Sequence, residues 1–470
     1  MNAAPGRPAN TTRSRAQRVL SLIAALAAVG LGSIASPALA AGSAQYAPRE
    51  VIVGYQPAAD HARGRASAAL AGEGPAVHTT LVKLRPGTSL STELARLRGQ
   101  RGVEWAVPDY RAHIAVTPAP YVPDDPGRPG GPAGGWEELQ WNFVGEFGVH
   151  APEAWANLIA DGAPGGKGVI VAVLDTGVAY ANRGPFRRSP DFTPYEFVKG
   201  YDFVAHSPYP NDRNGHGTFV AATIAEATNN GRGLTGLAYG ARIMPVRVLD
   251  SAGEGEASTI AEGVYFAVRH GAQVINLSLE FSPGVTASDI PELIAALRYA
   301  HRRGVLVVAA AGNEGHDAIA YPARAPYVVS VGATTEHGCL ADYSNDGAGL
   351  TLVAPGGGQD AALAGDPNCH PEEPGRDIFQ VTFTGSSYRK FGLPDGYEGT
   401  SMATPHVAAT AALIIASGVL GRHPSPAQLT ARLTATARPL GGGGDERLYG
   451  AGLLDAAAAT APGGPGAVVP

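Results

Sequence analysis

The sequence has no block of basic residues and no internal repeat. Its formal net charge is −6 and only 16% of its 470 residues are charged, which argues against a nucleic-acid-binding role. Beyond residue 40, no stretch reaches about 18 uninterrupted apolar residues, so none predicts a transmembrane helix. The 63 glycines and 38 prolines gather in loops such as 125–135 and 441–444 without a regular period, which excludes a collagen-like chain.

Cysteine is scarce as well. Only Cys339 and Cys369 are present, so the chain can form at most one internal disulfide. In an exported protein this bond would close a loop of about 30 residues and add about 3–4 kcal/mol of stability in the chain-entropy model. The alternative is a pair of free, small core residues.

The N-terminal 40 residues predict an export signal. Four arginines within residues 7–18 precede an apolar run at 19–34, and residues 37–40 end in an Ala-x-Ala pattern. This order predicts a secretory signal peptide cut after Ala40, and therefore a secreted, extracellular protein with no membrane attachment once the signal is removed. A membrane anchor is the alternative, but the run is short and no basic stop follows it.

Two folded units are expected after the signal, since 44% of the chain is hydrophobic and its length supports one large or two unequal domains. Residues 45–117 predict a small α/β unit, with strands at 50–55, 80–84 and 103–107 and a helix at 90–97. The segment 117–135 is rich in Pro and Gly and predicts a linker that proteases can reach.

From Trp136 onward, short apolar strands alternate with helices. The expected strands are 169–174, 242–249, 274–278, 305–310 and 328–331, and the expected helices are 217–228, 259–270, 290–303 and 402–417. Strands that are apolar on both faces indicate a parallel sheet covered on both sides. An active site is then expected at the carboxyl ends of the strands.

Four polar residues occupy such positions. Asp175 ends a strand, Asn313 follows another, His216 lies between two glycines before a helix, and Ser401 lies where a Gly-Thr-Ser turn leads into the helix at 402–417. Each has an ordinary explanation, because Asp and Asn are common in turns and Ser is a common helix N-cap.

The order Asp, His, Asn, Ser and the blocks around these residues resemble the subtilisin-like serine peptidases (subtilases). The blocks are VAVLDTGV, NGHGTFVA, AAAGNEG and GTSMATPHVA, and the resemblance covers most of residues 136–457. Segments 121–126 and 200–204 are similar to the thermitase-like branch. The resemblance implies a three-layer α/β fold, with a mainly parallel sheet covered by helices on both faces, preceded by a small α/β propeptide domain.

The resemblance also implies acyl transfer. Ser401 would attack the scissile carbonyl, His216 would accept and return its proton, and Asp175 would orient His216. The side-chain amide of Asn313 and the backbone N–H of Ser401 would hold the oxyanion. Phe219 stands where many members of the family have His.

The unit at 41–118 resembles the subtilase propeptide, an inhibitor and folding aid. This implies a signal peptide at 1–40, an inhibitory propeptide at 41–118 and a peptidase domain at 119–470, whose mature form begins near 117–121. The enzyme would be a monomer acting on protein or peptide substrates. A permanent N-terminal domain is the alternative.

Two edge segments, 251–255 and 278–280, are expected to bind substrate as an added strand. The implied substrate-binding residues are Gly253, Glu254, Gly255, Ser278, Leu279, Glu280 and Ala320, the last at the floor of the primary pocket. Glu280 stands where the family usually has glycine. With Glu254 and Glu256 it either favours basic side chains upstream of the cleaved bond or simply points into water.

Residues 228–234 resemble the family's high-affinity calcium loop, and Ca²⁺ takes about six to eight oxygen ligands. The implied ligands are the side chains of Asp125, Asp191 and Asn230 and the backbone carbonyls of Thr228, Arg232 and Leu234. The alternative is an Asn-Asn-Gly turn without metal. A second site near Asp202 and Asp212 has weak support, because Ser207 stands where an acid would be expected.

Residues 357–397 form a long insertion before Ser401. It is expected either to shape the far side of the cleft or to be tethered through Cys369, and residues 460–470 are expected to form a flexible tail. A catalytically inactive binding protein of the same fold is the competing hypothesis, which the complete four-residue set disfavours. An esterase of the α/β-hydrolase type would need a Gly-x-Ser-x-Gly elbow and the order Ser, Asp, His, which this sequence does not have.

Overall fold

The computed structural model describes residues 46–55, 78–110, 119–441 and 445–463. The predicted signal peptide, the expected start of the mature chain at 117–118 and the end of the tail lie outside the described residues, so those boundaries remain predictions. Within the described residues, no helix is long and apolar enough to cross a membrane.

In its described residues, 46–55 and 78–110, the N-terminal unit is a three-stranded antiparallel sheet with one helix, as the sequence predicts. Its strands are β1 (Tyr46–Tyr55), β2 (His78–Lys83) and β3 (Val103–Tyr110), in the order β2-β1-β3, and its helix is α2 (Leu90–Arg98). Ser89 caps α2 by accepting a hydrogen bond from Thr92 N. Leu94 and Leu97 of α2 share a buried core with Val51 and Val53 of β1.

The main domain is built on a seven-stranded parallel sheet, in the order β10-β9-β8-β7-β4-β6-β5. The strands are β4 (Ile170–Asp175), β5 (Tyr201–Asp202), β6 (Arg242–Arg247), β7 (Val274–Leu277), β8 (Leu306–Ala310), β9 (Val328–Thr334) and β10 (Leu352–Pro355). All four residues of β7 are buried. The prediction of an apolar sheet covered on both faces is confirmed.

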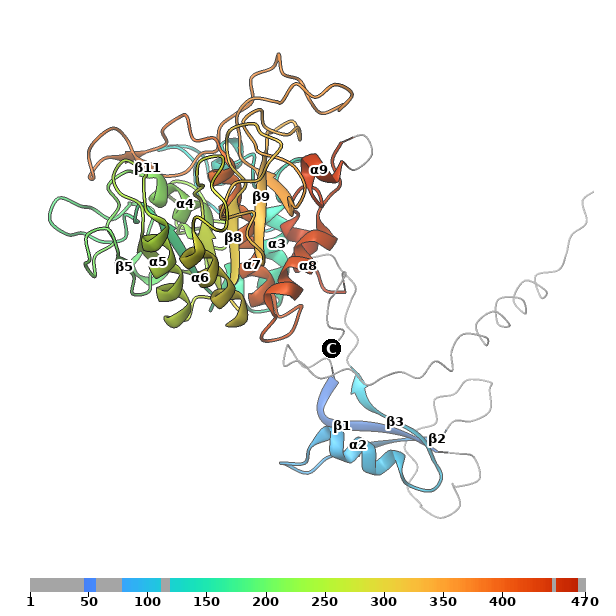
Figure 1. Ribbon diagram of the computed structural model, residues 1–470. Coiled ribbons are helices and arrows are strands. Elements are labelled where there is room, and N and C mark those ends of the chain that lie inside the picture. Colours follow the sequence, from blue (N-terminus) through green and yellow to red (C-terminus); the bar gives the residue numbers. More distant parts are fainter. Residues whose placement is uncertain (1–45, 56–77, 111–118, 442–444, 464–470) are drawn as a thin grey trace, which may run out of the picture. The chain divides into compact units, whose positions relative to one another are not determined.

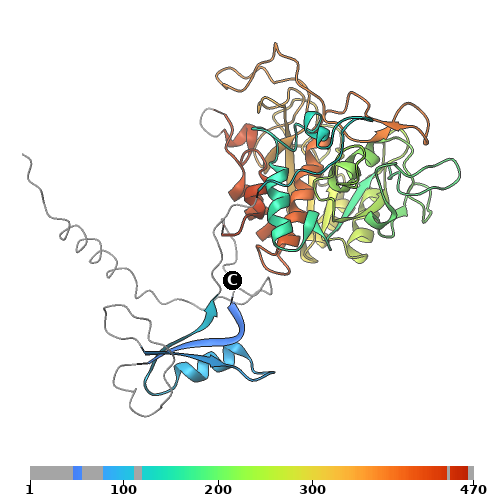
Figure 2. The ribbon, with the colours of Figure 1, turned by 180° about the vertical axis from the view of Figure 1, so that it is seen from behind.

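Helices cover the two faces of this sheet, because alternate strand residues point to opposite sides. Val171 and Val173 of β4 join the core that contains α3 (Ala151–Ala160), α4 (His216–Ala225) and α7 (Thr400–Ser417). Ala172 and Leu174 join the other core, which contains α5 (Ala257–Arg269) and α6 (Pro291–Arg302). Figure 1 shows α5 and α6 on the near side, and Figure 2 shows the opposite side with α3 and α7.

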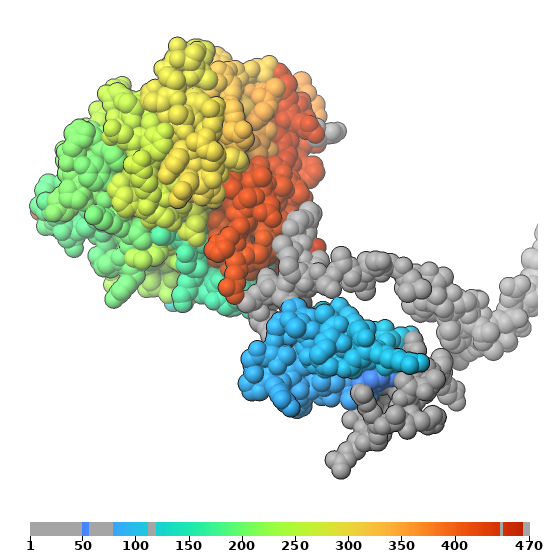
Figure 3. All heavy atoms as spheres, turned by 60° about the horizontal axis from the view of Figure 1, so that its bottom comes forward, coloured from blue at the N-terminus to red at the C-terminus, as the bar shows by residue number. Residues whose placement is uncertain are grey.

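Shorter elements complete the domain. They are η2 (Gly135–Glu138), η3 (Pro164–Gly166), η4 (Pro194–Glu196), β11 (Thr382–Phe383), β12 (Phe391–Gly392), α8 (Pro426–Thr436), α9 (Glu446–Tyr449) and α10 (Ala456–Thr460). In the space-filling view the region of α5 and α6, yellow-green to yellow, adjoins the orange-red C-terminal segment on one continuous surface (Figure 3).

Cys339 and Cys369 form a disulfide with an S–S distance of 2.04 Å, which confirms the predicted bond. Cys339 is fully buried between β9 and β10. The bond therefore ties the long segment 357–397 to the body of the domain. Within that segment β11 and β12 form a two-stranded antiparallel hairpin.

Candidate active site

Asp175 and His216 are brought together by the ends of β4 and α4. The Nδ1 of His216 lies 2.8 Å from Asp175 Oδ1 and 3.0 Å from Oδ2. Asp175 is fully buried, and the backbone N–H of Thr176 donates to its Oδ1 over 2.7 Å. An ionised carboxylate only accepts hydrogen bonds, so Nδ1 carries a proton and the other ring nitrogen is left as a base.

Asp212 organises the turn that presents His216. This fully buried carboxylate accepts from Gly215 N (3.0 Å) and Thr176 Oγ1 (2.9 Å), and from Thr218 N (2.9 Å) and Oγ1 (2.6 Å). These bonds join the end of β4 to the first turn of α4. The sequence supports Asp212 only as a weak metal ligand, whereas in the structure its oxygens accept hydrogen bonds from the protein itself.

The electrostatics around His216 favour its cationic form. Burial of the ring opposes the charge, but the carboxylate of Asp175, through both its charge and its hydrogen bond, and the charge of Asp212 outweigh it. The pKa of His216 therefore lies above its usual value of 6.5. This environment suits a group that gains a proton during a reaction and later returns it.

Ser401 is the second residue of α7, where backbone N–H groups have no acceptor within the helix. The N-cap is Gly399, whose φ of 144° lies in the region that favours glycine. Ser401 Oγ instead donates to Ser278 O over 3.2 Å, while Ser278 Oγ donates to Ser401 O over 2.8 Å. The alternative that Ser401 is merely a helix cap is therefore wrong.

Pro405 explains why the carbonyl of Ser401 is available to Ser278. In a regular helix, the N–H four residues later would bond to this oxygen, and proline has no N–H. The hydroxyl of Ser278, directly after β7, takes that place. The missing helix bond thus becomes a link between the sheet and the turn that carries Ser401.

Asn313 follows β8 and points its amide toward the same place. Its Oδ1 accepts from Thr400 N (2.7 Å) and Thr400 Oγ1 (3.0 Å). Its Nδ2 donates to Glu280 Oε1 over 3.1 Å, and its backbone N donates to Glu280 Oε2 over 3.2 Å. Glu280 therefore does not simply point into water.

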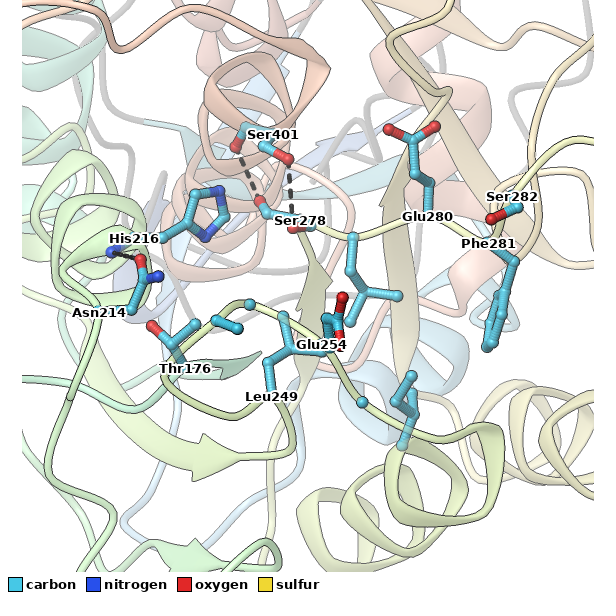
Figure 4. Close-up of a pocket in the computed structure, with 15 residues that line it drawn as sticks. Thr176, Asn214, His216, Leu249, Glu254, Ser278, Glu280, Phe281, Ser282 and Ser401 are labelled. Atoms are coloured by element: carbon cyan, nitrogen blue, oxygen red, sulfur yellow. Dashed lines mark hydrogen bonds between the residues drawn. The ribbon is translucent and has the colours of Figure 1, made fainter.

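A pocket of about 560 Å³ opens beside these residues. In Figure 4, the ring of His216 lies beside Ser401 and Ser278, which are joined by two dashed bonds. The residues that line the pocket are Thr176, Asn214, His216, Leu249, Ala252, Gly253, Glu254, Gly255, Ile260, Ser278, Leu279, Glu280, Phe281, Ser282 and Ser401. Of the predicted substrate-binding residues, only Ala320 lies outside this lining. Its backbone N donates to Ala311 O.

The insertion reaches the His216 turn from outside the sheet. Thr382 Oγ1 donates to Gly215 O over 2.6 Å. The ring of Tyr397 stacks on Phe219 of α4, with centroids 4.1 Å apart and planes 5° from parallel. An aromatic residue at position 219 thus has a direct packing reason in this chain.

The predicted calcium ligands are also brought together. Asp125 accepts from Asn229 N (2.6 Å) and Asn230 N (2.9 Å). Asp191 accepts from Asn230 Nδ2 (2.8 Å) and Leu234 N (3.0 Å). Both carboxylates are buried against the loop 228–234, which also contains the backbone carbonyls of Thr228 and Arg232.

This donor set fits a hard cation. Burial raises the pKa of Asp191 to about 7, and the neighbouring charge of Asp125 adds to the effect. Asp125 and Asp191 thus lack a nearby positive charge that would stabilise their ionised forms. Oxygen ligands on a loop are what Ca²⁺ prefers. No cluster of three or more His, Cys, Asp and Glu side chains that could hold a metal occurs in the described part of the chain. A cation here would thus rely on the carbonyls and the amide.

Glu226, which belongs to none of the sequence motifs, lies close to this loop. It is fully buried, and neither of its carboxylate oxygens has a hydrogen-bond partner of ordinary geometry. Burial and the charges of Asp191, Asp125 and Glu196 raise its pKa well above 4.5, with only the backbone N–H of Val381 acting in the opposite direction. A charged residue at the end of an apolar helix is the signal that could have found it.

The two carboxylates of the weaker second metal site already have partners within the protein. Asp202 forms a buried ion pair with Arg247 over 3.1 Å, and its Oδ1 also accepts from Ala205 N. Asp212 is occupied by the turn described above. Ser207 exchanges backbone hydrogen bonds with Asp202.

Comparison with known proteins agrees with this geometry. Residues 166–452 match the model of the subtilase family, and residues 33–109 match the fervidolysin N-terminal prodomain. Subtilisin Savinase from Lederbergia lenta is 41% identical over 297 residues, which is 63% of this chain and 91% of that protein. A thermophilic serine proteinase from Bacillus sp. (strain AK1) is 35% identical over 67% of this chain and 64% of its own length.

A solved structure is similar as well. A protease from Pseudoalteromonas arctica PAMC 21717 superposes with a TM-score of 0.58 at 30% identity, covering 72% of this chain and 98% of that one.

Proposed function

Because the chain belongs to the subtilase family and is a subtilisin-like serine protease, we propose that Ser401, His216 and Asp175 form its catalytic triad. The observation that carries this proposal is that His216, hydrogen-bonded to the buried Asp175, lines one pocket together with Ser401. Ser401 Oγ attacks the scissile carbonyl and forms an acyl-enzyme, which water then hydrolyses. His216 accepts the hydroxyl proton and delivers it to the leaving amine, while Asp175 stabilises the cationic ring.

The hydroxyl of Ser401 donates to Ser278 O. Rotation about its Cα–Cβ bond would exchange this acceptor for the free ring nitrogen of His216. Catalytic hydrogen bonds often become short only when substrate is bound. The Ser278 contact therefore describes a resting position of the nucleophile.

The oxyanion is held by two donors, the Nδ2 of Asn313 and the backbone N–H of Ser401. The second lies in the first turn of α7, where the helix dipole also favours negative charge. Thr400, which bonds to Asn313 Oδ1, fixes the orientation of the first donor relative to the second.

The protein is made as a secreted zymogen in this proposal. The signal occupies 1–40, the inhibitory propeptide 41–118 and the peptidase domain 119–470, and the enzyme cuts its own propeptide near 117–121. The match to a prodomain supports the inhibitory role, and the disulfide supports export, because such bonds persist in oxidising compartments. The resemblance of segments 121–126 and 200–204 supports a relationship to the thermitase-like branch.

We further propose that loop 228–234 binds one structural Ca²⁺. The ligands are the side chains of Asp125, Asp191 and Asn230 and the carbonyls of Thr228, Arg232 and Leu234. A bound cation would neutralise the buried carboxylates and hold the N-terminal segment at Asp125 against the loop.

The main substrate segments are 251–255 and 278–280, which bind an extended peptide as an added strand. Glu254 on one wall of the pocket supports a preference for basic side chains upstream of the cleaved bond. A peptide library in which Lys and Arg are not enriched at these positions would contradict this preference.

The deciding experiment is expression of the full chain in a secreting host, followed by N-terminal sequencing of the product. We expect a mature N-terminus near 117–121, covalent labelling by a serine-directed phosphonate, and cleavage of peptide amides. The Ser401→Ala variant should fold, remain unprocessed and fail to react. Normal activity of that variant would overturn the assignment of the nucleophile.

A further inference from the structure

Glu280 accepts two hydrogen bonds from Asn313. Its Oε1 accepts the side-chain N–H of Asn313 at 3.1 Å, and its Oε2 accepts the backbone N–H of the same residue at 3.2 Å. Glu280 belongs to the segment after β7 and Asn313 to the loop after β8, so the two hydrogen bonds join the ends of neighbouring strands of the sheet. One carboxylate thus holds both the side chain and the backbone of Asn313.

The chemistry of the partners fixes which end of the Asn313 amide faces which neighbour. Thr400 N can only donate, and it lies 2.7 Å from the amide, so the amide oxygen faces Thr400. The nitrogen must then face Glu280. Glu280 and Thr400 together hold the amide plane from opposite ends, and the second N–H of Nδ2 is left for another acceptor.

The carboxylate of Glu280 also lies close to the backbone of Gly312. Gly312 has a φ of +118°, and a Cβ on it would lie 2.6 Å from Glu280 Oε2 and 2.1 Å from Asn345 Nδ2. Any side chain at 312 would therefore displace the carboxylate. Glu280 also lines the pocket that contains Ser401 and His216 (Figure 4).

We propose that Glu280 is a positioning residue that aims the Asn313 nitrogen at the oxyanion, and that ionisation of its carboxylate weakens this oxyanion hole. The inference rests on the proposed role of Asn313 as an oxyanion donor. A neutral Glu280 keeps the contact with Asn313 Nδ2 through its carbonyl oxygen without adding charge, while its protonated oxygen donates to Glu314 instead of accepting strongly from the backbone N–H of Asn313. An ionised Glu280 places a negative charge on the same nitrogen that must stabilise a second negative charge in the transition state.

The pKa of Glu280 lies close to neutral pH. Burial, followed by the like charge of Glu314, raises its pKa to about 7, although the Asn313 bonds oppose this. Glu314 lies in the loop after β8 and accepts from Asn345 Nδ2 over 2.6 Å. Glu254 is the other acidic side chain of the pocket lining. Within the described residues, Glu280 has no ion pair with Lys, Arg or His.

Two opposing titrations follow. His216 must be neutral to accept a proton, so kcat/KM rises with pH through the pKa of His216. Glu280 acts better when neutral, so kcat/KM falls as pH rises through about 7. The result is a bell-shaped profile near neutral pH, with Glu280 responsible for its alkaline limb.

The test compares pH profiles of kcat/KM for the mature wild type and three variants. Glu280→Gln keeps an acceptor and cannot ionise, so the alkaline decline should disappear. Glu314→Gln removes the neighbouring like charge, so the alkaline limb should move to lower pH. Glu280→Ala removes both hydrogen bonds to Asn313, so kcat should fall about tenfold with KM nearly unchanged. Circular dichroism and phosphonate labelling verify that each variant is folded with a reactive Ser401.

An alkaline limb that is the same in the wild type and Glu280→Gln would overturn the proposal, as would an unchanged kcat in Glu280→Ala. Either result leaves the triad intact if Ser401→Ala is inactive. Activity of Ser401→Ala would instead reject the proposed function itself, so the two failures are distinguishable.

Discussion

Ser278 and Ser401 exchange two hydrogen bonds, each donating its hydroxyl to the backbone oxygen of the other, over 2.8 and 3.2 Å. One residue follows strand β7 and the other lies in the first turn of helix α7, 123 positions later in the chain. The exchange is possible because Pro405 leaves the carbonyl of Ser401 without its helix donor. The position of the nucleophile thus depends on the sheet as well as on its own helix.

This relationship predicts the effect of Ser278→Ala. Loss of the hydroxyl leaves the Ser401 carbonyl without a donor, so the free energy of unfolding should fall by about 1–2 kcal/mol. Urea denaturation of the inactive Ser401→Ala background measures it without autolysis. Pro405→Ala restores a backbone N–H, so the double variant Ser278→Ala/Pro405→Ala should lose less than the sum of the single changes. Strict additivity would contradict the proposed replacement of one donor by the other.

Asn313→Ala should lower kcat by about 10²–10³-fold and change KM little, because an oxyanion donor acts in the transition state. Steady-state hydrolysis of a peptide amide measures both constants. Asn313→Asp is the matched control, since it keeps the shape and the Thr400 contacts but has no N–H to donate. A variant Asn313→Asp as active as wild type would show that this donor is not used.

The Asp175 carboxylate predicts a pH effect on His216. Because Asp175 favours the cationic ring, Asp175→Asn should lower the pKa of His216. The rise of kcat/KM should then move to lower pH, while its maximum falls by about 10³–10⁴-fold, since the ring loses the acceptor that fixes its tautomer. NMR titration of His216 in the Ser401→Ala background measures the pKa directly, and the value there should exceed 6.5 when Asp175 is present. An unchanged pKa in the Asp175→Asn protein would be inconsistent with the geometry.

Removal of calcium should destabilise the mature enzyme. A cation present at about 100 times its Kd stabilises a protein by about 2.7 kcal/mol, so EDTA should lower Tm by several degrees. Asp191→Asn removes one charged ligand and should largely abolish the difference between calcium and EDTA. Glu226→Gln is the control, because it relieves repulsion near the loop while leaving the proposed ligands in place. It should raise Tm in EDTA and still respond to calcium. The same Tm of the wild type with and without EDTA would reject the site.

Much of the fold follows from local sequence patterns. The apolar runs that precede Asp175 and Asn313 are long enough and β-branched enough to predict strands, and the observed ends differ from the predicted ones by a few residues. Helix α8 was missed although its signals are present. Ser425 and Gln428 form a capping box, and Pro426 occupies the first turn.

The parts of the site that could not be predicted depend on contacts between distant segments. The bond from Ser401 to Ser278 competes with capping only once β7 and α7 are adjacent, so the local sequence favoured a cap. The conformation of Glu280 is equally long-range, since the sequence left its carboxylate free to bind substrate or water. The burial of Glu226 depends on how the segment around Val381 packs over the end of α4, which no local pattern encodes.

The order of the strands has a consequence for how this site can diverge. Asp175 ends β4, while Ser278 and Asn313 follow β7 and β8, and these three strands are consecutive in the sheet. Neighbouring strands are about 4.8 Å apart whatever their side chains are. The hydrogen-bonded backbone of the sheet therefore sets the spacing between these three residues. Lengthening a surface loop, as in 357–397, does not change the spacing of the strands. Substrate preference can therefore change by insertion and deletion at the rim while the chemistry keeps its dimensions.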